Sequence, residues 1–495
     1  MKTKREKVKT LILSLLIISS LVLSVSTWVY EKLWPTGYSF FSNFSDIPVI
    51  STLFGSTDNY SIPVDNLSKP GKIVVTNGEI RSVYYNSDSS FAGLHSVTRD
   101  FLVSVLTNED IVIRRAAVSP DEWYDVLRND ELLDTKSIYA EFSLSYTPDL
   151  FAQIMGVQHT WVTQPAAVRD FIIAPLGNDG QDMLLYARDA NNDLVYKHYV
   201  VYDKKADIIN AISEYTSNES GNFIFSFEQN LDGSSEGIGG EIQQKVFVDS
   251  LVLLSPESTE TDIITAENPI DTSDTQALNE LLSCFGYAPN SLRHYTAADE
   301  TEYFVENYGS LRIYPSGIIE YTALDTSKAY DLFEDDNTTR SLYETLNRAI
   351  EFSESVWNTV MPDTEFNALV TSDLVENNAA PGEYTFTLDY YFEGTPITVD
   401  APDMKNAVII EVKNGRITSY RHLIRRFTQT GESVQNISMV DALDILYSTL
   451  SAQESEEATV VTELFLSYVE DSNQSQKTAV WCAKIQGSDE VRRLN

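Results

Sequence analysis

The first thirty residues contain the feature that most constrains this chain. Residues 11–29 carry no charged side chain, and five Lys or Arg residues precede them. A helix of this length spans about 28 Å, close to the hydrocarbon thickness of a bilayer. Basic residues ahead of such a span stay in the cytoplasm. We therefore expect a basic cytoplasmic arm over residues 1–10, a transmembrane helix over residues 11–30, and the bulk of the chain on the extracytoplasmic side of the cell membrane.

Aromatic residues after the apolar stretch favour a membrane anchor. Trp28, Tyr30 and Trp34 fall where amphipathic rings settle at the outer interface. The alternative is a cleaved signal peptide, because residues 24–26 (Ser-Val-Ser) offer small side chains for a peptidase. The apolar run is longer than a usual signal-peptide core, and no flexible mature start follows it. We favour the anchor over the signal peptide.

The predicted helix also has a face suited to helix packing. Small or hydroxyl side chains recur at Ser20, Ser24 and Thr27, and these positions share a face with Leu13 and Ile17. Small residues at this spacing let two membrane helices approach closely. The alternative is that the hydroxyls bond to the backbone of their own helix. This face is a candidate contact with the membrane helix of a partner.

The charge of the chain excludes one class of partner. The net charge is −38, and residues 33–495 carry 29 basic against 71 acidic side chains, a net charge of −42. So electronegative a body repels nucleic acid and anionic lipid. The hydrophobic share of 43% supports folded cores rather than a disordered stalk. We expect no nucleic-acid partner and a globular extracytoplasmic region.

Turn and periodicity signals divide the chain into a tether and three folded units. Residues 31–70 are rich in Ser, Asn, Pro and Gly, which is typical of a tether. We expect an N-terminal α+β domain over residues 71–240, a central one over residues 241–375 and a C-terminal one over residues 376–495. The Gly- and Ser-rich residues 230–240 mark the first boundary. The expected fold class is α+β, with antiparallel sheets and helices packed on them.

Local signals predict particular elements within these domains. Asn77-Gly78 predicts a hairpin, because this dipeptide favours two-residue turns. Ser119, followed by proline, predicts a helix that runs to about residue 133. Residues 255–274 are expected to form a polar loop. Further helices are expected over residues 94–106, 206–215, 275–284, 342–357 and 438–450, and strands over residues 138–146 (half-buried), 222–227 and 416–427.

The search for catalytic chemistry is negative. The sequence contains no H-E-x-x-H, Walker-type phosphate loop or S-x-x-K motif. Residues 233–237 match G-x-S-x-G in letters, but they lie in a Gly/Ser-rich run. Residues 189–200 begin like a calcium loop but lack its glycine and its final glutamate. We predict no catalytic residue, no cofactor and no metal site.

The cysteines and histidines give no stronger signal. A disulfide between Cys284 and Cys482 is permitted outside the cytoplasm, but two cysteines this far apart are no framework signature. We favour two small buried thiols. The five histidines are scattered and form no ligand pair.

One basic cluster stands out against the acidic background. Its members are Arg416, Arg421, His422, Arg425 and Arg426. On one continuous strand, Arg421 and Arg425 share a face, and the other three share the opposite face. The functional interpretation is a docking patch for an acidic partner. The alternative, which we favour, is a solvated strand whose cations pair with nearby carboxylates.

Short segments spread along nearly the whole chain follow the order of one known family. They include Y-A-E-F at residues 139–142 with Thr147-Pro148, and also residues 4–28, 290–293, 303, 311–313, 319–321, 384–386, 394–397 and 410–420. In this layout the chain resembles the YycH family. Each segment is degenerate, none is a catalytic signature, and residues 43–60 and 255–274 match no family feature.

The resemblance implies a non-enzymatic, single-pass membrane protein that regulates signal transduction in cell wall homeostasis. YycH is the membrane-anchored regulator of the WalK/WalR two-component system, also called YycG/YycF. The resemblance implies protein–protein interaction with two partners, a YycI-like companion regulator and a WalK-like sensor histidine kinase. No binding residue of the family maps onto this chain. The main alternative is a surface module that binds carbohydrate or peptide without a kinase partner, and an envelope enzyme ranks third.

Overall fold

The computed structural model describes residues 67–494, apart from short gaps. The gaps lie at residues 79, 87, 89, 129–134, 218–222, 230, 232–245, 290–291, 334–339, 373, 375–381, 402–403, 452–458, 472–474 and 489–490. The predicted cytoplasmic arm, the transmembrane helix and nearly all of the tether lie outside the described residues, as does almost all of the predicted linker. Within the described part, no helix combines the length and apolar character needed to cross a membrane.

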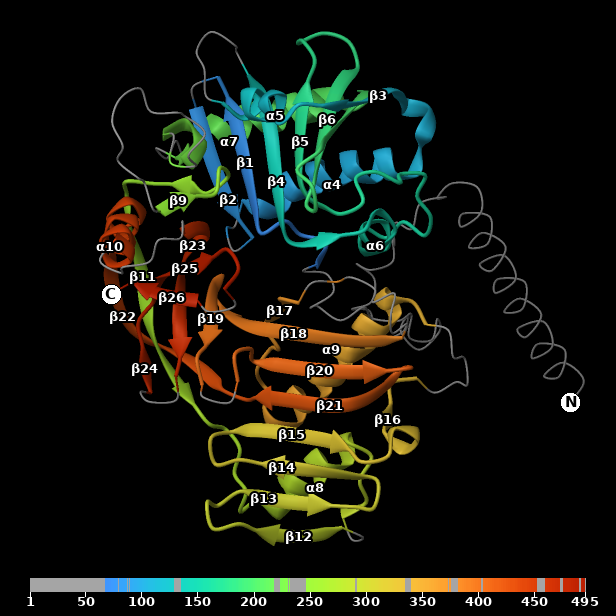
Figure 1. Cartoon of the computed structure of the whole chain (residues 1–495), viewed down its shortest axis with the longest axis vertical. Helices are drawn as coiled ribbons and strands as arrows, with labels where there is room; N and C mark the ends of the chain where they lie inside the picture. Colours follow the sequence, from blue (N-terminus) through green and yellow to red (C-terminus); the bar gives the residue numbers. More distant parts are fainter. Residues whose placement is uncertain are drawn as a thin grey trace, which may run out of the picture. The chain divides into compact units, whose positions relative to one another are not determined.

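An antiparallel sheet of seven strands forms the first part of the described chain, in the order β2-β1-β4-β5-β6-β7-β3 (Figure 1). The hairpin predicted at Asn77-Gly78 is confirmed, because β1 and β2 pair around Gly78, which takes a φ of 61°. Glycine adopts this conformation without steric cost. The strands are β1 (Lys72–Asn77), β2 (Ile80–Tyr85), β3 (Val112–Val118), β4 (Lys136–Tyr146), β5 (Val168–Pro175), β6 (Asp182–Asp189) and β7 (Val195–Val201).

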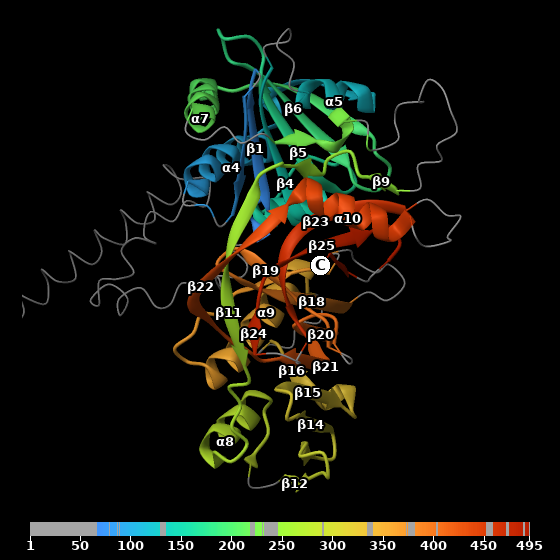
Figure 2. The same cartoon turned by 90° about the vertical axis from the view of Figure 1, so that its left-hand side faces the viewer.

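Helices lie on both faces of this sheet (Figure 2). α4 (Phe91–Thr107) and α7 (Lys205–Ser217) pack against each other on one face, and α5 (Pro120–Leu127) lies on the other. α6 (Pro148–Ile154) follows β4, and the Thr147 hydroxyl caps it by accepting from the Leu150 amide. α4 begins three residues before its predicted start, and α5 and α7 begin within one residue of theirs.

The helix predicted from Ser119 is shorter than expected. It ends at Leu127 rather than near residue 133. Arg81 Nη2 donates to the Leu127 carbonyl oxygen at 2.6 Å, and Arg128 takes an extended backbone conformation. A side chain from β2 therefore satisfies one of the carbonyl groups that a helix end leaves open.

Strand β4 is covered on both faces, which corrects its expected half-buried character. Tyr139 is 1% exposed and lies edge-on to the rings of Trp123 and Phe225. Ile138 and Ala140, which point to the opposite face, are also buried. β4 is a central strand because β1 and β5 pair with its two edges, and these partners come from distant parts of the sequence.

A short segment completes the layer that α5 begins. β8 (Ile224–Phe225) pairs with β10 (Leu253–Leu254) and continues directly into the 3-10 helix η3 (Ser226–Gln229). The strand predicted over residues 222–227 is therefore only two residues long. Phe225 is fully buried in the apolar core under this layer, so packing rather than strand pairing places the segment.

Within the described part of the chain, a larger sheet contains fourteen strands, and its main path runs β12-β13-β14-β15-β21-β20-β18-β19-β23-β25-β26. Most pairs are antiparallel, but β23 is parallel to β19 and to β9. The rings of Phe285, which directly follows α8, and of Phe352 in α9 pack on one face of this sheet. The elements are β9 (Val246–Val248), α8 (Thr275–Cys284), β12 (Arg293–Thr296), β13 (Glu302–Val305), β14 (Gly309–Ile313), β15 (Ile318–Ala323), β16 (Tyr330–Asp331), α9 (Leu342–Val360), β17 (Ala368–Val370), β18 (Glu383–Phe392), β19 (Thr395–Val399), β20 (Val408–Lys413), β21 (Arg416–Leu423), β23 (Thr459–Glu470), β25 (Val480–Ile485) and β26 (Val491–Leu494).

This sheet crosses the boundary predicted between the central and C-terminal domains. The boundary at residues 375–376 itself lies outside the described residues. On either side of it, β15 and β21 pair antiparallel, with Tyr321 opposite Tyr420. Strands of the two expected domains therefore share one sheet and one hydrophobic core.

The prediction that residues 255–274 form a polar loop is wrong. Half of it forms β11 (Ser258–Glu267), which pairs antiparallel with β22 (Arg426–Ser438) and briefly with β24 (Gln476–Lys477). Both strands are rich in polar residues, and all but one residue of each are exposed or partly exposed, so neither has the apolar alternation of a half-buried strand. β11 and β22 form a ribbon because two segments far apart in the sequence pair with each other. No local sequence pattern predicts it.

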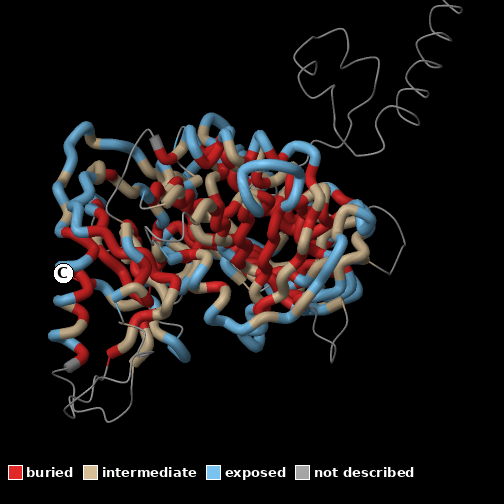
Figure 3. The backbone as a smooth tube through the Cα atoms, turned by 90° about the horizontal axis from the view of Figure 1, so that it is seen from above, coloured by how far each residue is buried: buried red, intermediate tan, exposed pale blue. Residues whose placement is uncertain are grey.

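The last helix, α10 (Met439–Ser451), lies within one residue of its predicted range at each end. The Ser438 hydroxyl accepts from the Asp441 amide at 3.1 Å. Figure 3 shows buried stretches of the backbone gathered in the interior and many exposed stretches at the periphery. The described residues thus have the α+β class that the sequence predicted.

Candidate functional site

The candidate membrane contacts lie outside the described residues. They are Leu13, Ile17, Ser20, Ser24 and Thr27 of the helix face and the interface residues Trp28, Tyr30 and Trp34. Their roles stay predictions.

The predicted basic cluster does not lie along one strand. β21 stops before Ile424 and β22 begins at Arg426, so the expected pattern of two shared faces is wrong. Arg416 Nη2 lies 2.5 Å from Asp331 Oδ2, and Arg421 Nε lies 3.5 Å from a carboxylate oxygen of β15. Pairing with nearby carboxylates, the interpretation that we favoured, is therefore confirmed for these two cations. Docking of a partner on the exposed Arg426 stays a prediction.

Two members of the basic cluster belong to the core. Arg425 is 5% exposed, and its Nε donates to Glu470 Oε1 at 3.2 Å. His422 is fully buried between two tyrosines, with Tyr390 Oη 2.6 Å from Nε2 and Tyr420 Oη 2.7 Å from Nδ1. Burial lowers the pKa of His422 to about 3, so this side chain is neutral. The prediction that these two residues belong to a docking patch is wrong, because both side chains are buried.

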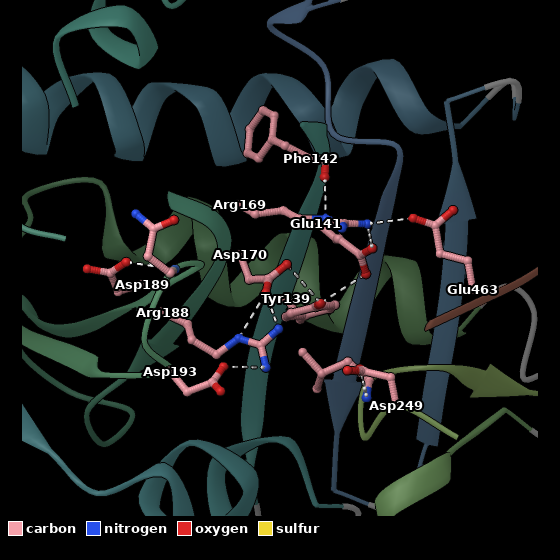
Figure 4. A network of polar contacts seen from close by, with 12 residues as sticks. Tyr139, Glu141, Phe142, Arg169, Asp170, Arg188, Asp189, Asp193, Asp249 and Glu463 are labelled. Atoms are coloured by element: carbon pink, nitrogen blue, oxygen red, sulfur yellow. Dashed lines mark hydrogen bonds and ion pairs between the residues drawn. The ribbon is translucent and has the colours of Figure 1, made fainter. Parts of the chain in front are cut away.

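A different group of charged residues joins the seven-stranded sheet to β23 (Figure 4). β1, β4, β5 and β6 supply six of its side chains, and β23 and β25 supply one each. We call it the charge cluster. Its members are Lys72, Tyr139, Glu141, Arg169, Asp170, Arg188, Glu463 and Lys484.

Arg169 is the member that bridges the two sheets. Its Nη2 lies 2.9 Å from Glu141 Oε1 and 3.2 Å from Glu463 Oε1, and its Nε donates to the Phe142 carbonyl oxygen at 3.1 Å. Lys484 Nζ lies 2.8 Å from the second carboxylate oxygen of Glu463. The Arg169 and Glu463 side chains are 32% and 33% exposed. This bridge therefore lies at the rim of the packed region, within reach of water.

The rest of the cluster lies deeper in the seven-stranded sheet. Lys72 Nζ lies 2.7 Å from Glu141 Oε2, and Tyr139 Oη donates to the same oxygen at 3.0 Å. Tyr139 Oη is also 3.2 Å from Asp170 Oδ1. Arg188 donates to Asp170 Oδ2 from Nη2 at 2.8 Å and from Nε at 3.1 Å. The Tyr139 hydroxyl thus connects two ion pairs on neighbouring strands.

The cations decide the charge state of Glu141. Burial alone would raise the pKa of Glu141, but Lys72 and Arg169 outweigh burial and hold this pKa at about 2. At Asp170 burial wins, and the pKa is raised even though Arg188 opposes the shift. The pKa values of two carboxylates within one cluster are therefore shifted in opposite directions.

The arrangement is suited to holding structural elements together. Each carboxylate in the cluster already contacts a cation, so ligand binding would have to break an ion pair. Among the residues that the structure describes, no group of three or more His, Cys, Asp or Glu side chains could hold a metal ion. Both cysteines are free thiols, and burial raises the pKa of Cys482 to about 11.

A small cavity of about 30 Å³ lies between α4, α6 and the seven-stranded sheet. Its lining is apolar except for Gln164 and His198. Burial lowers the pKa of His198 to about 4, with a smaller contribution from Arg115. A space of this size holds a water molecule rather than an organic ligand.

Sequence reasoning missed the charge cluster. A signal was present, because Arg169-Asp170 and Arg188-Asp189 place charged pairs inside otherwise apolar strand segments. Charged residues in a buried strand need partners. Their partners are on other strands, however, and the sequence does not say which.

No protein-family model and no curated protein matches the sequence. The structure superposes on YycH from Bacillus subtilis with a TM-score of 0.54 and 12% sequence identity, covering 87% of this chain and 97% of that chain. The chain has a YycH-like fold. The resemblance to YycH that the sequence predicted is thus confirmed for the fold.

A second solved structure is more distant. An uncharacterized protein from Eubacterium rectale aligns with a TM-score of 0.34 and 13% identity, covering 51% of this chain and 87% of that chain. A similarity this low carries no argument, and the YycH-like fold rests on the Bacillus subtilis structure.

Proposed function

We propose that this chain is a non-enzymatic, membrane-anchored regulator that modulates a sensor histidine kinase controlling the cell wall. The observation that carries the proposal is the YycH-like fold, which spans 97% of that YycH chain. The order of short sequence segments agrees with the same family. The partners we propose are a WalK-like kinase and a YycI-like companion regulator.

The N-terminal segment supports the proposed location. Residues 11–29 are long enough to span a bilayer, and the basic residues before them favour a cytoplasmic N-terminus. The described residues then lie outside the cytoplasm, next to the outer domains of the partners. The helix face of Ser20 and Ser24 is our candidate for contact within the membrane.

A regulator shifts a kinase only if its contacts differ between the two signalling states. The charge cluster offers a joint where such a difference can arise. The two side chains of the bridge from Arg169 to Glu463 are about one-third exposed, and an ion pair of this kind contributes about 1 kcal/mol or less. A partner whose binding free energy differs by at least this amount between the open and the closed joint can therefore shift the joint.

The test is co-purification of the tagged full-length chain from membranes. We expect it to recover the kinase and the companion regulator, and we expect replacement of Ser20 and Ser24 by Leu to reduce the recovery severalfold. Ser26→Leu is the matched control, because it makes the same change on a different side of the helix. Equal recovery by all variants would remove the helix face from the proposal. A mature chain free in the growth medium, trimmed near residue 26, would overturn the proposal as a whole.

A further inference from the structure

The larger sheet ends in an exposed edge strand. β12 is the last strand on its path, and among the described residues only β13 pairs with it (Figure 1). All four of its residues, Arg293 to Thr296, are exposed. An open edge presents unpaired backbone donors and acceptors that can pair with another chain.

The register shows which backbone groups of β12 face outward. The Ala297 amide donates to the Thr301 carbonyl oxygen at 2.9 Å, where the β12–β13 hairpin closes. Hydrogen-bonded and non-hydrogen-bonded pairs alternate along an antiparallel ladder. Tyr295 therefore exchanges hydrogen bonds with β13, whereas His294 and Thr296 direct their N–H and C=O groups away from it. These groups are placed to accept a further strand.

A row of side chains crosses the sheet and ends at this edge. Cross-strand pairing places five residues opposite one another on neighbouring strands: Tyr295, Tyr303, Arg312, Glu320 and Arg421. The first two rings stack 4.9 Å apart at 6°, and the Arg312 guanidinium lies 5.4 Å from the centre of the Tyr303 ring. Arg312 Nη1 is 3.0 Å from Glu320 Oε1. Tyr295 is 53% exposed, and the row has no described residue beyond it.

The helices lie on the other face of the sheet. Rings from α9 and from the end of α8 pack on Tyr321 and Tyr420. These tyrosines are sequence neighbours of Glu320 and Arg421, so the row points to the opposite face. Figure 2 shows α8 and α9 on one side of these strands. A strand added at β12 would continue the face that the helices leave uncovered.

The charge around the edge selects the kind of partner. Residues 293–306 contain one arginine and four acidic side chains. A second copy of this chain would bring the same acidic hairpin and a further net charge of −38 to the contact. A basic segment is attracted instead. A cation or an aromatic ring placed opposite Tyr295 would also extend the stacked row.

We propose that β12 is a docking edge to which a partner protein adds an extended segment with basic and aromatic side chains. Main-chain hydrogen bonds to His294 and Thr296 provide affinity, and the open ring of Tyr295 provides selectivity. This inference rests on the proposed function, because it assigns the segment to the kinase or the companion regulator. It adds a contact outside the membrane to the contact proposed for the helix.

The experiment compares Thr296→Pro with Thr296→Ala in the full-length chain. Proline removes the outward N–H but is tolerated on an edge strand, whereas alanine keeps the N–H. Co-expressed kinase and companion regulator are the probes, and recovery from membranes is measured at low and high salt. We expect Thr296→Pro to lower recovery more than about tenfold and Tyr295→Ala to lower it about threefold to tenfold. Thr296→Ala should retain wild-type recovery, and salt should weaken the wild-type complex.

Hydrogen exchange provides a second readout. The amides of His294 and Thr296 should become protected when the partners bind, and circular dichroism verifies that each variant is folded. Equal recovery by all variants with no new protection would overturn the docking edge and leave the proposed function standing. A changed oligomeric state with unchanged partner recovery would assign the edge to a second copy and overturn our choice of partner. Failure of the wild-type chain to recover either probe would overturn both proposals.

Discussion

The buried His422 predicts a specific loss of stability in mild acid. In the folded chain, Tyr390 donates to the Leu423 carbonyl oxygen at 2.9 Å, so its hydroxyl can accept from Nε2 of the neutral ring. The Tyr420 hydroxyl lies at Nδ1 on the other side. The neutral ring is therefore satisfied at both nitrogens. A proton added to it would place a charge in a site without a carboxylate partner.

The size of the effect follows from the two pKa values. The pKa of His422 is about 3 in the folded chain, against an ordinary value of 6.5. Between these values the unfolded chain binds the proton and the folded chain does not, so stability falls as pH falls below 6.5. At pH 5.0 the loss is about 2 kcal/mol, from about 1.5 pH units at about 1.4 kcal/mol each. His198, with a pKa of about 4, adds a loss of about the same size.

Urea unfolding of the chain in detergent, followed by circular dichroism at pH 7.5 and 5.0, measures this loss. We expect the free energy of unfolding to fall by about 2 kcal/mol more in the wild type than in His422→Gln between these two pH values. Tyr420→Phe is the control, because it removes a hydrogen bond to the ring but keeps the titrating group. It should lower stability at both pH values and keep the wild-type pH dependence. An unchanged pH dependence in His422→Gln would refute the reasoning.

Two further predictions concern the seven-stranded sheet. Arg169→Met should destabilise the chain by about 1 to 2 kcal/mol, because it leaves partly buried carboxylates without their shared cation. The control is Arg348→Met, which breaks an exposed ion pair within α9 and should change stability by less than about 0.5 kcal/mol. If Arg169→Met and Arg348→Met lowered the free energy of urea unfolding equally, the charge cluster would not be a joint between the sheets. Trp123→Ala should cost about 3 to 5 kcal/mol, because its fully buried ring fills the core between α5 and the sheet. Leu324→Ala, at a 65% exposed site, should leave the thermal midpoint nearly unchanged, and a comparable drop in both variants would contradict this packing.

Elements with local signals were predictable, and elements that depend on distant partners were not. The hairpin at Gly78 and the cap at Ser438 arise from turn and capping chemistry within a few residues. β11 was missed because its partner β22 lies far along the chain, as in the bond from Gln429 to Asp262 across 167 residues. Polar side chains of β11 form hydrogen bonds with side chains of β22, so the strand has no apolar alternation that would predict it.

The predicted site residues also fall into those that local sequence determines and those that distant partners determine. The run of apolar and basic residues at the N-terminus is a local property, so its suitability for a membrane follows from composition alone. Whether a charged side chain in the folded part is buried or exposed depends on the residues that surround it in three dimensions. His422 and Arg425 became core residues because β18, β21 and β23 surround them, although nothing in their own segment distinguishes them from Arg426.

By itself the sequence determined the α+β class, most helices and hairpins, the acidic character and the order of segments that resembles YycH. The tertiary structure alone decided that β15 and β21 share a sheet, that Arg169 bridges to Glu463, and that β12 is an open edge. The physical reason is the range of the interactions. Turns, caps and periodicity act over a few residues, whereas pairing, burial and ion-pair partners are set by which distant segments the core brings together.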